Sequence, residues 1–369
     1  MVESQQNLWI FKPSGYNQPL LFEYFGSLSI LIHKFGGPAS RMDNLTHTLY
    51  GLALAKTGLH RATPRATLAL IVGANFPDVD SASLFWGQLN YLKYHRAITH
   101  SFAGVVLGAL LLASIIYCVN NLLLKKAQAS WWRLFCLGLT GIASHILLDY
   151  TNSYGIRPLL PFSGRWYAWD TVFIIDPWIL LLLVLGLGLS FLFGLINQEI
   201  GARPGGSHGG AIFCLIAILS YWLLKDFSHR QAVAELRQGV YSTGTPLQVA
   251  ALPKLLDPFR WNGIVETQTA YHKTEVGWTL SPGSYPPGTK VVHKTEQDDI
   301  VESAKKGPAA RIFLDFARFP WFQIEPSEEG YIVALRDLRF DFASRRRRGF
   351  TCTISLDHQR RLISEDFRF

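Results

Sequence analysis

Three long apolar segments constrain the fold of this chain more than any other feature. They span His100–Leu124, Trp131–Tyr150 and Val172–Ile196, and they carry few charges. A helix needs about 20 predominantly apolar residues to cross the roughly 30 Å hydrocarbon layer of a bilayer. Because lipid offers no hydrogen bonds to the backbone, these segments must satisfy their own N–H and C=O groups as helices. We therefore expect three membrane-spanning helices here.

Three further apolar segments are shorter. Gly210–Lys225 is of marginal length for a membrane span. Asp43–Thr57 and Arg65–Phe76 have helical patterns and are joined by a turn containing Pro64, which favours a hairpin packed inside the bundle. The sequence thus predicts a mainly α fold, a polytopic membrane helical bundle of four to six helices, with a small β-rich soluble domain after it.

The uneven distribution of charge divides the chain at about residue 225. Residues 1–225 contain 15 of the 35 Lys and Arg and 9 of the 27 Asp and Glu. We predict a membrane helical domain over residues 42–225 and a β-rich domain over residues 226–369, which a helix at Asp226–Arg237 leads out of the membrane. The expected strands, rich in β-branched and aromatic residues, include Gly263–Ala270, Tyr331–Leu338, Phe350–Leu356 and Leu362–Phe369.

The first 41 residues fit neither region. Lys12 and Glu23 interrupt their apolar patches, and no clear signal peptide is present. Since the first helical pattern starts directly after Met42, we expect either that the natural chain starts at Met42 or that residues 1–41 form a loosely ordered extension.

The net charge of +8 fits a membrane partner. Basic residues flank membrane helices and face anionic headgroups. The one dense basic run, Arg345–Arg348, is interpreted as a loop between strands, so we expect a lipid bilayer as partner and no nucleic acid. The four cysteines are scattered without the spacing of a metal site or a disulfide framework.

The ionisable residues of the helical half fall at the ends of the predicted helices. In an up-down bundle, the starts of the first, third and fifth helices share a membrane face with the ends of the second and fourth. Residues at these positions are His47, Asp78, Asp80, His95, Arg96, His100, His145 and Asp149. Ionisable residues at membrane depth are functional by default, so this convergence on one face predicts a site.

The residue types at this face suit a metal ion. His145 and Asp149 are four residues apart and share one helix face, as do Asp43 and His47. Histidine together with carboxylate suits zinc or another divalent first-row metal. We predict a divalent metal, zinc foremost, with ligands among His47, Asp78, Asp80, His95, His100, His145 and Asp149.

Several of these positions have a second interpretation. Asp78 or Asp80 can act as a general base or a helix cap, and His47 can form a hydrogen bond within the bundle. His95 and His100 can pair with lipid phosphate, while Arg96 is either a headgroup anchor or a catalytic phosphate clamp. We expect Asp170 and Asp176 to support the ligands or to cap a helix, because Asp176 precedes Pro177.

Four motifs in order give the chain a family resemblance. They are Met42-Asp43-Asn44-Leu45-Thr46-His47, Pro77-Asp78-Val79-Asp80, His95-Arg96-Ala97-Ile98-Thr99-His100-Ser101 and Ser144-His145-Ile146-Leu147-Leu148-Asp149. Over roughly residues 42–180 the sequence resembles the YdjM-type family of bacterial inner-membrane metal-dependent hydrolases, and its C-terminal domain resembles that of longer members. This family is similar to zinc-dependent phospholipase C, an all-helical fold whose metals are held by histidines and aspartates. His145 and Asp149 match the His-x-x-x-Asp pair of that enzyme. The resemblance implies hydrolase activity and a phospholipid-like substrate.

We accordingly predict a membrane-bound metal-dependent hydrolase that cleaves a phosphoester of a lipid or lipid-like substrate at the headgroup level by metal-activated water. Asp78 or Asp80 would act as the base, and Arg96 would stabilise the charge of the transition state. The alternative is a non-enzymatic metal-binding membrane protein, such as a transporter or sensor. Transporter sites lie near the bilayer midplane between repeats, which fits this chain less well. The sequence contains no His-Glu-x-x-His run, so a zinc peptidase of that kind has little support.

The basic residues also predict an orientation. Those on the face opposite the site are Lys56, Arg61, Arg65, Lys125, Lys126, Arg133 and Arg203, against Lys93, Arg96, Arg157 and Arg165 on the site's own face. Because basic loops favour the cytoplasm, we expect a multi-pass bacterial inner-membrane protein with an extracytoplasmic site. The C-terminal domain is expected on the same side as the site.

Overall fold

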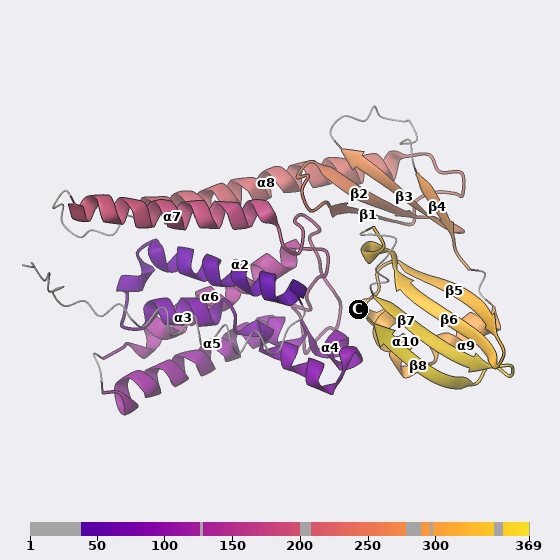
Figure 1. Ribbon diagram of the computed structural model, residues 1–369, viewed down its shortest axis with the longest axis horizontal. Coiled ribbons are helices and arrows are strands. Elements are labelled where there is room, and N and C mark those ends of the chain that lie inside the picture. Colours follow the sequence, from indigo (N-terminus) through magenta and orange to yellow (C-terminus); the bar gives the residue numbers. More distant parts are fainter. Residues whose placement is uncertain are drawn as a thin grey trace, which may run out of the picture.

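The computed structural model describes residues 38–125, 128–199, 208–277, 289–295, 298–342 and 350–368. Most of the predicted N-terminal extension and the basic run Arg345–Arg348 lie outside these residues, as does the side chain of Asp43. Within them, a helical bundle and a β region lie end to end, with the long helix α8 reaching from one to the other (Figure 1). The helices are α2 (Pro38–Lys56), α3 (Ala66–Gly73), α4 (Gln88–Tyr94), α5 (Phe102–Tyr117), α6 (Trp131–Thr151), α7 (Pro177–Glu199), α8 (Gly209–Gln238), α9 (Asp299–Lys305) and α10 (Pro308–Phe316).

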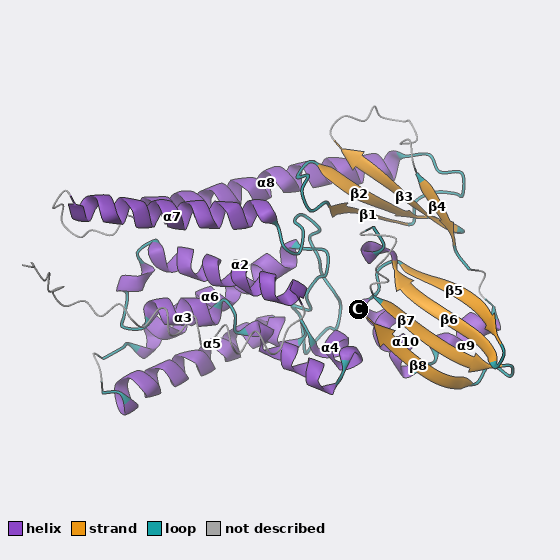
Figure 2. Ribbon diagram, viewed as in Figure 1, coloured by secondary structure: helices purple, strands orange, loops and turns teal. Residues whose placement is uncertain are grey.

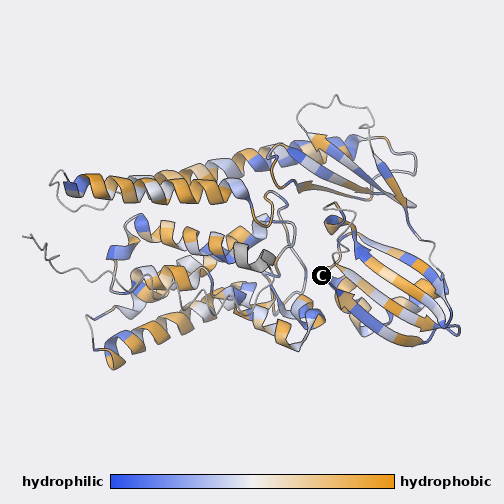
Figure 3. Ribbon diagram, in the orientation of Figure 1, coloured by the Kyte–Doolittle hydropathy of each residue, from blue (hydrophilic) through white to orange (hydrophobic). Residues whose placement is uncertain are grey.

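Four of the described helices are long and apolar enough to cross a membrane. They are Phe102–Leu123, Trp131–Thr151, Pro177–Asn197 and Gly209–Gln238. The first of these runs from α5 into a π-helical turn, η4 (Cys118–Leu123). Hydrophobic residues dominate the ribbons of α5 and α7 (Figure 3). The exposed residues of α5, α7 and α8 include many Leu, Phe and Ile side chains. The predicted membrane bundle is therefore confirmed, and the marginal sixth segment is part of a 30-residue helix that also contains the helix expected at Asp226–Arg237.

The helical packing depends on small residues. A Cβ atom on Gly141 of α6 would lie 2.7 Å from the carbonyl oxygen of Leu70 in α3, and one on Gly51 of α2 would lie 2.9 Å from the same oxygen. Helices approach this closely in membranes where glycine removes the side chain. Helices α2 and α3 thus pack against each other and α3 packs against α6, and neither is among the helices long and apolar enough to span a membrane.

Short irregular helices connect the spans at the end of the bundle nearest the β region. The chain leaves α3 through a 3-10 segment, η2 (Pro77–Trp86), passes through α4, and enters α5 after a second 3-10 turn, η3 (Ile98–His100). Residues 152–176 link α6 to α7 at the same end (Figure 1). Backbone that is not α-helical is tolerated at membrane depth only where protein or a cavity surrounds it, so these connectors are natural carriers of a site.

The C-terminal region consists of two four-stranded antiparallel sheets, with strand orders β1-β2-β3-β4 and β5-β6-β7-β8. The prediction of a β-rich domain is confirmed, and the strands form two separate sheets (Figure 2). The strands are β1 (Gln248–Pro253), β2 (Arg260–Glu266), β3 (Ala270–Gly277), β4 (Lys290–His293), β5 (Pro320–Ser327), β6 (Gly330–Asp337), β7 (Thr351–Asp357) and β8 (Leu362–Arg368).

The two sheets pack on different parts of the helical region. Ala232 and Leu236 of α8 share a buried core with Trp261 of the first sheet. The second sheet covers α9 and α10, and its core also contains Leu92 of α4 and Tyr154 of the loop after α6. The second sheet is therefore docked on the connectors described above.

Candidate metal centre

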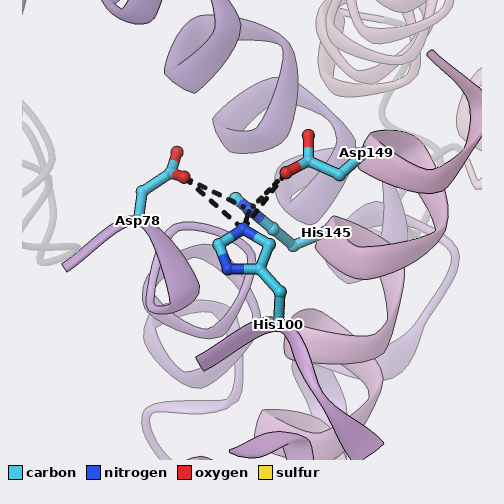
Figure 4. Close-up of side chains that lie close together, drawn as sticks. All are labelled: Asp78, His100, His145 and Asp149. Atoms are coloured by element: carbon cyan, nitrogen blue, oxygen red, sulfur yellow. Dashed lines mark hydrogen bonds and ion pairs between the residues drawn. The ribbon is translucent and has the colours of Figure 1, made fainter. Parts of the chain in front are cut away.

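Four side chains from three elements converge at the connector end of the bundle. Asp78 comes from η2, His100 from η3, and His145 and Asp149 from α6. Their donor atoms all lie within 4.8 Å of one another, and Figure 4 shows the four groups pointing into one space. His100, His145 and Asp149 are almost fully buried, whereas the side chain of Asp78 is 12% exposed. Asp78 is therefore the most exposed of these four side chains.

The distances within this cluster fit a single metal ion. His100 Nε2 lies 3.1 Å from His145 Nε2 and 3.1 Å from Asp149 Oδ2, and His145 Nε2 lies 3.4 Å from Asp149 Oδ2. Asp78 Oδ1 lies 3.5 Å from His145 Nε2 and 3.8 Å from His100 Nε2. Four ligands at about 2.0–2.1 Å from a tetrahedral ion are about 3.3–3.4 Å from each other. The cluster is thus suited to hold a metal ion.

The far side of each histidine ring fixes which nitrogen faces the cluster. His145 Nδ1 lies 2.8 Å from the carbonyl oxygen of Ala74, which can only accept, so Nδ1 carries the proton. His100 Nδ1 lies 3.2 Å from Asp80 Oδ2 and 3.0 Å from Thr99 Oγ1. A ligating histidine usually donates its second N–H to a carboxylate or a backbone carbonyl in this way.

This arrangement leaves four acceptors facing one another. With Nδ1 protonated, each neutral ring presents a lone pair at Nε2, and Asp78 and Asp149 add two carboxylates. Neither oxygen of Asp149 accepts a hydrogen bond of good geometry from the described residues, although Arg96 Nη2 is 2.9 Å from Oδ1. Such a set requires a cation, which is either additional protons or a metal.

The pKa directions show the same demand for positive charge. Burial acts to lower the pKa of His100, but the charges and hydrogen bonds of Asp80 and Asp149 outweigh burial and raise it. Burial acts to raise the pKa of Asp78, but the neighbouring charge and hydrogen bond of His145 outweigh burial and lower it. Both effects arise because the carboxylates stabilise any cation held between them.

Asp80 and His95 form a second layer beside the cluster. The Asp80 carboxylate accepts hydrogen bonds from His95 Nδ1 at 2.7 Å, from the backbone N–H of Arg96 at 3.0 Å and from Thr99 Oγ1 at 2.5 Å. It also lies 3.2 Å from His100 Nδ1. Asp78, Asp80 and His95 also satisfy the distance requirement for a metal-binding group. Burial acts to raise the pKa of Asp80, but His95 and His100 hold that pKa well below its usual range. Asp80 is therefore an ionised carboxylate that orients both histidines.

His47 and Arg96 line the opposite side of Asp149. The His47 ring stacks on His145 with centroids 3.9 Å apart, and its Nε2 lies 3.5 Å from Asp149 Oδ1. Arg96 is 3% exposed and has a left-handed backbone conformation with a φ of 57°. Its Nη1 donates to Asn152 Oδ1 at 3.0 Å. A side chain this buried does not reach lipid headgroups, so Arg96 is not placed as a headgroup anchor.

Of the remaining predicted residues, Asp176 caps a helix and Asp170 contacts the C-terminal region. Asp176 Oδ1 accepts from the backbone N–H of Trp178 and Ile179 at the start of α7, as expected of a residue before Pro177. Asp170 Oδ2 accepts from Arg318 Nη2 at 2.7 Å. The structure thus brings His47, Asp78, Asp80, His95, Arg96, His100, His145 and Asp149 together and places Asp170 and Asp176 outside the cluster. The ligand, base and clamp roles assigned from the sequence remain predictions.

Sequence reasoning missed four groups that support the cluster. These are the Ala74 carbonyl, Asn152, Tyr154 and Arg339. A backbone carbonyl has no sequence signature, and Arg339 lies far from the helical motifs along the chain. Of these groups, only Asn152 could have been found from the sequence. It lies three residues after Asp149, directly after the last residue of α6 and so at the same end of the helix.

Comparison with known proteins agrees with this architecture. The family model of the YdjM inner membrane protein matches residues 42–232, more than half of the 369 residues. The model of the YfhP C-terminal alpha/beta plait domain matches residues 299–368, which contain α9, α10 and the second sheet. The chain is 23% identical over 313 residues to the uncharacterized protein YfhP of Bacillus subtilis (strain 168), covering 81% of this chain and 87% of that protein. No solved structure matches the chain. The chain therefore belongs to the YdjM inner membrane protein family.

Proposed function

We propose that this protein is a metal-dependent hydrolase of the bacterial inner membrane that cleaves a phosphoester of a lipid or lipid-like substrate at the headgroup level. The observation that carries the proposal is the set of four acceptors at one point, two histidine Nε2 atoms and two carboxylates, with both rings oriented from behind. His100, His145 and Asp149 would hold the ion, and the fourth position would be left for a water beside Asp78. Zinc fits this donor set, since it accepts nitrogen and oxygen ligands in tetrahedral geometry.

A bound zinc ion would lower the pKa of a water ligand toward about 7 and polarise a phosphoryl oxygen. The remaining roles, orienting the ligands and accepting a proton, fall to residues of the chain. Asp80 already receives four donors, so its role is to orient His95 and His100. Asp78 is the exposed member of the cluster, and we propose it as the residue that takes a proton from water.

Arg96 has a role beside Asp149 in this proposal. Its guanidinium is shared between Asp149 and Asn152, so we propose that it orients Asp149 and offsets negative charge at the site. The sequence predicted that Arg96 stabilises the transition state. For that role its guanidinium would have to act from the far side of the Asp149 carboxylate, which it contacts.

Exposed apolar residues at the connector end of the bundle support a lipid substrate. Val79 follows Asp78 and is 59% exposed, and Phe85 and Trp86 of the same segment η2 are more exposed still. Phe102 at the start of α5 and Phe162 of the loop before α7 are also exposed. Aromatic side chains at the end of membrane spans favour the headgroup level of the bilayer. A lipid headgroup would therefore meet the cluster beside Asp78.

The test uses the purified chain in detergent or in vesicles. Bound metal is measured by elemental analysis, and release of phosphate or headgroup is measured with phospholipid and isoprenoid-phosphate substrates. We expect about one divalent ion per chain and metal-dependent product release. A chain that holds metal but releases no product from any of these lipids would contradict the hydrolase proposal.

The second candidate is a non-enzymatic metal-binding membrane protein, such as a transporter or sensor. One observation favours it: the Asp78 carboxylate also lies within 4.8 Å of the other three groups. As a fourth ligand it would close the site, as in structural metal sites. Metal uptake by vesicles that contain the protein, without product release, would select this candidate.

We also propose that the site faces away from the cytoplasm. Basic residues gather at the opposite end of the bundle, where Arg65 donates to Asn120 and Arg133 donates to the Ala62 carbonyl, and basic loops favour the cytoplasm. The second sheet docks at the site end, so a reporter fused after Phe369 should report an extracytoplasmic position. A cytoplasmic signal would reverse this orientation.

A further inference from the structure

The core of the second sheet extends into the candidate metal centre. Tyr154, five residues after Asp149, is 7% exposed and belongs to the same buried cluster as Phe313 and Phe316 of α10. The Tyr154 ring lies 4.7 Å from the Phe316 ring. On its other side, the guanidinium of Arg96 lies 4.9 Å from the Tyr154 ring centroid. The Tyr154 side chain therefore contacts both Arg96, which touches Asp149, and the second sheet's module, by which we mean α9, α10 and the second sheet.

Arg339 makes the polar part of this contact. It follows β6, is 7% exposed, and lies in a 3-10 turn, η5 (Leu338–Phe340). Its Nη1 donates to the Ser153 carbonyl at 2.7 Å, and its Nη2 donates to the Phe316 carbonyl at 2.9 Å. Asp337 receives Arg339 Nε at 2.8 Å and so fixes the plane of the guanidinium. A buried, charge-assisted contact of this kind holds a backbone carbonyl in place.

Only a few short contacts separate Arg339 from the donor atoms of the cluster. Ser153 follows Asn152, whose Oδ1 accepts from Tyr154 N–H at 2.9 Å and from Arg96 Nη1 at 3.0 Å. Arg96 Nη2 then lies 2.9 Å from Asp149 Oδ1. The carbonyl that Arg339 holds thus belongs to the turn that sets Asn152, and Asn152 sets the guanidinium beside Asp149.

A second arginine of the same module anchors the neighbouring loop. Arg318 Nη2 donates to Asp170 Oδ2 at 2.7 Å. The residues on either side of Asp170 bond to the end of α6, because Trp169 N–H donates to the Tyr150 carbonyl and Thr171 N–H donates to the Thr151 carbonyl. The module of the second sheet therefore holds the C-terminal end of α6 from two directions.

We propose that the second sheet's module is part of the metal centre, and that Arg339 is a positioning residue that holds Asp149 and Arg96 in place through the 152–154 turn. This inference rests on the proposed metal-binding function. It assigns the C-terminal module a direct effect on metal affinity, beyond any contact with substrate.

The test compares full-length variants reconstituted with Co²⁺ in place of zinc. Arg339→Met keeps an apolar stem against Phe316 but removes every donor, and Arg339→Lys keeps the charge with a single donor group. Arg368→Met is the matched control, since Arg368 lies in the same sheet with its side chain 79% exposed. Metal affinity is measured by competition with a chelator, and the visible absorption of Co²⁺ reports the ligand geometry.

Arg339→Met should weaken metal affinity about tenfold and alter the Co²⁺ spectrum, as loss of an outer-layer contact does. Arg339→Lys should restore part of both, and Arg368→Met should match the wild type. If Arg339→Met fails to fold, Arg318→Gln, whose side chain is 27% exposed, should still shift the spectrum. Folded variants with unchanged affinity and spectrum would overturn this inference alone. A wild-type chain that binds no Co²⁺ or zinc would overturn the proposed function, and this inference with it.

Discussion

The buried charges of the helical region and of the C-terminal region are arranged in opposite ways. In the two sheets each buried charge has its own counter-charge, as in Arg339 with Asp337 and Lys273 with Asp341. In the helical region the acceptors of His100, His145, Asp78 and Asp149 face one another. Pairing satisfies charge within the protein, whereas convergence leaves a demand for a cation that the four acceptors cannot meet among themselves. The contrast marks the second arrangement as a candidate ligand site, whereas the paired charges need no ion of their own.

The largest effect should follow substitution of one of the side chains that face one another in the cluster. His145→Ala and Asp149→Asn should each lower metal affinity by more than about 100-fold and abolish metal-dependent activity, because direct ligands matter more than outer-layer partners. Bound metal is measured by elemental analysis of the purified chain.

His358→Ala is the matched control for these two variants. His358 is exposed and contacts only the Glu328 carbonyl among the described residues, so its metal content should equal that of the wild type. Full metal content in both site variants would remove the assignment of His145 and Asp149 as ligands.

Asp80→Asn should have a smaller effect, because we assign Asp80 to orientation. An amide presents one acceptor oxygen where the carboxylate presents two, so His95 and His100 would lose part of their support. We expect metal affinity to fall by about 10–100-fold while metal still binds at saturation.

Asp176→Asn is the control for Asp80→Asn, since Asp176 is a buried aspartate that accepts two backbone N–H groups outside the cluster. Its metal affinity should be unchanged. A complete loss of metal in Asp80→Asn would instead make Asp80 a direct ligand, one of the roles that the sequence left open.

These two predictions also show how far the sequence alone can go. The spacing of His145 and Asp149 and the position of each polar residue at a helix end are local features. The structure brings eight of the predicted side chains together, while Asp170 and Asp176, expected at the same face, lie outside the cluster. Local spacing does not report burial, so only the 3% exposure of Arg96 argues against the headgroup anchor. The division of the C-terminal region into two sheets likewise depends on long-range packing against α8 in one case and Tyr154 in the other.

A glycine substitution should connect helix packing to the site with a still smaller effect. In Gly141→Leu the new side chain would press on the backbone of Leu70 in α3 and of Ala74 just after it, since a Cβ alone lies 2.7 Å from the Leu70 carbonyl oxygen. Overpacking of this kind typically costs about 1–3 kcal/mol. The Ala74 carbonyl that orients His145 would shift with α3, so we expect metal affinity to fall several-fold as well.

Gly188→Leu is the control for this substitution, because nothing among the described residues lies within 4 Å of a Cβ at Gly188. Thermal unfolding in detergent and chelator competition measure the two effects separately. Loss of stability in Gly141→Leu with unchanged metal affinity would mean that the Ala74 contact is not needed to hold the ion.

The smallest effect should come from breaking a paired charge. Lys273 is 9% exposed, and its Nζ lies 2.6 Å from Asp341 Oδ2 and 4.4 Å from the centroid of the Phe342 ring. Asp341 is half-exposed, so water screens this ion pair, and exposed pairs contribute only about 0–1 kcal/mol. Lys273→Met keeps the apolar stem of the side chain, and we expect the free energy of unfolding to change by less than about 1 kcal/mol. Metal affinity should not change, because the Asp341 carboxylate stays half-exposed to water and the substitution buries no charge. A measurable loss of metal in Lys273→Met would show that the first sheet also acts on the site.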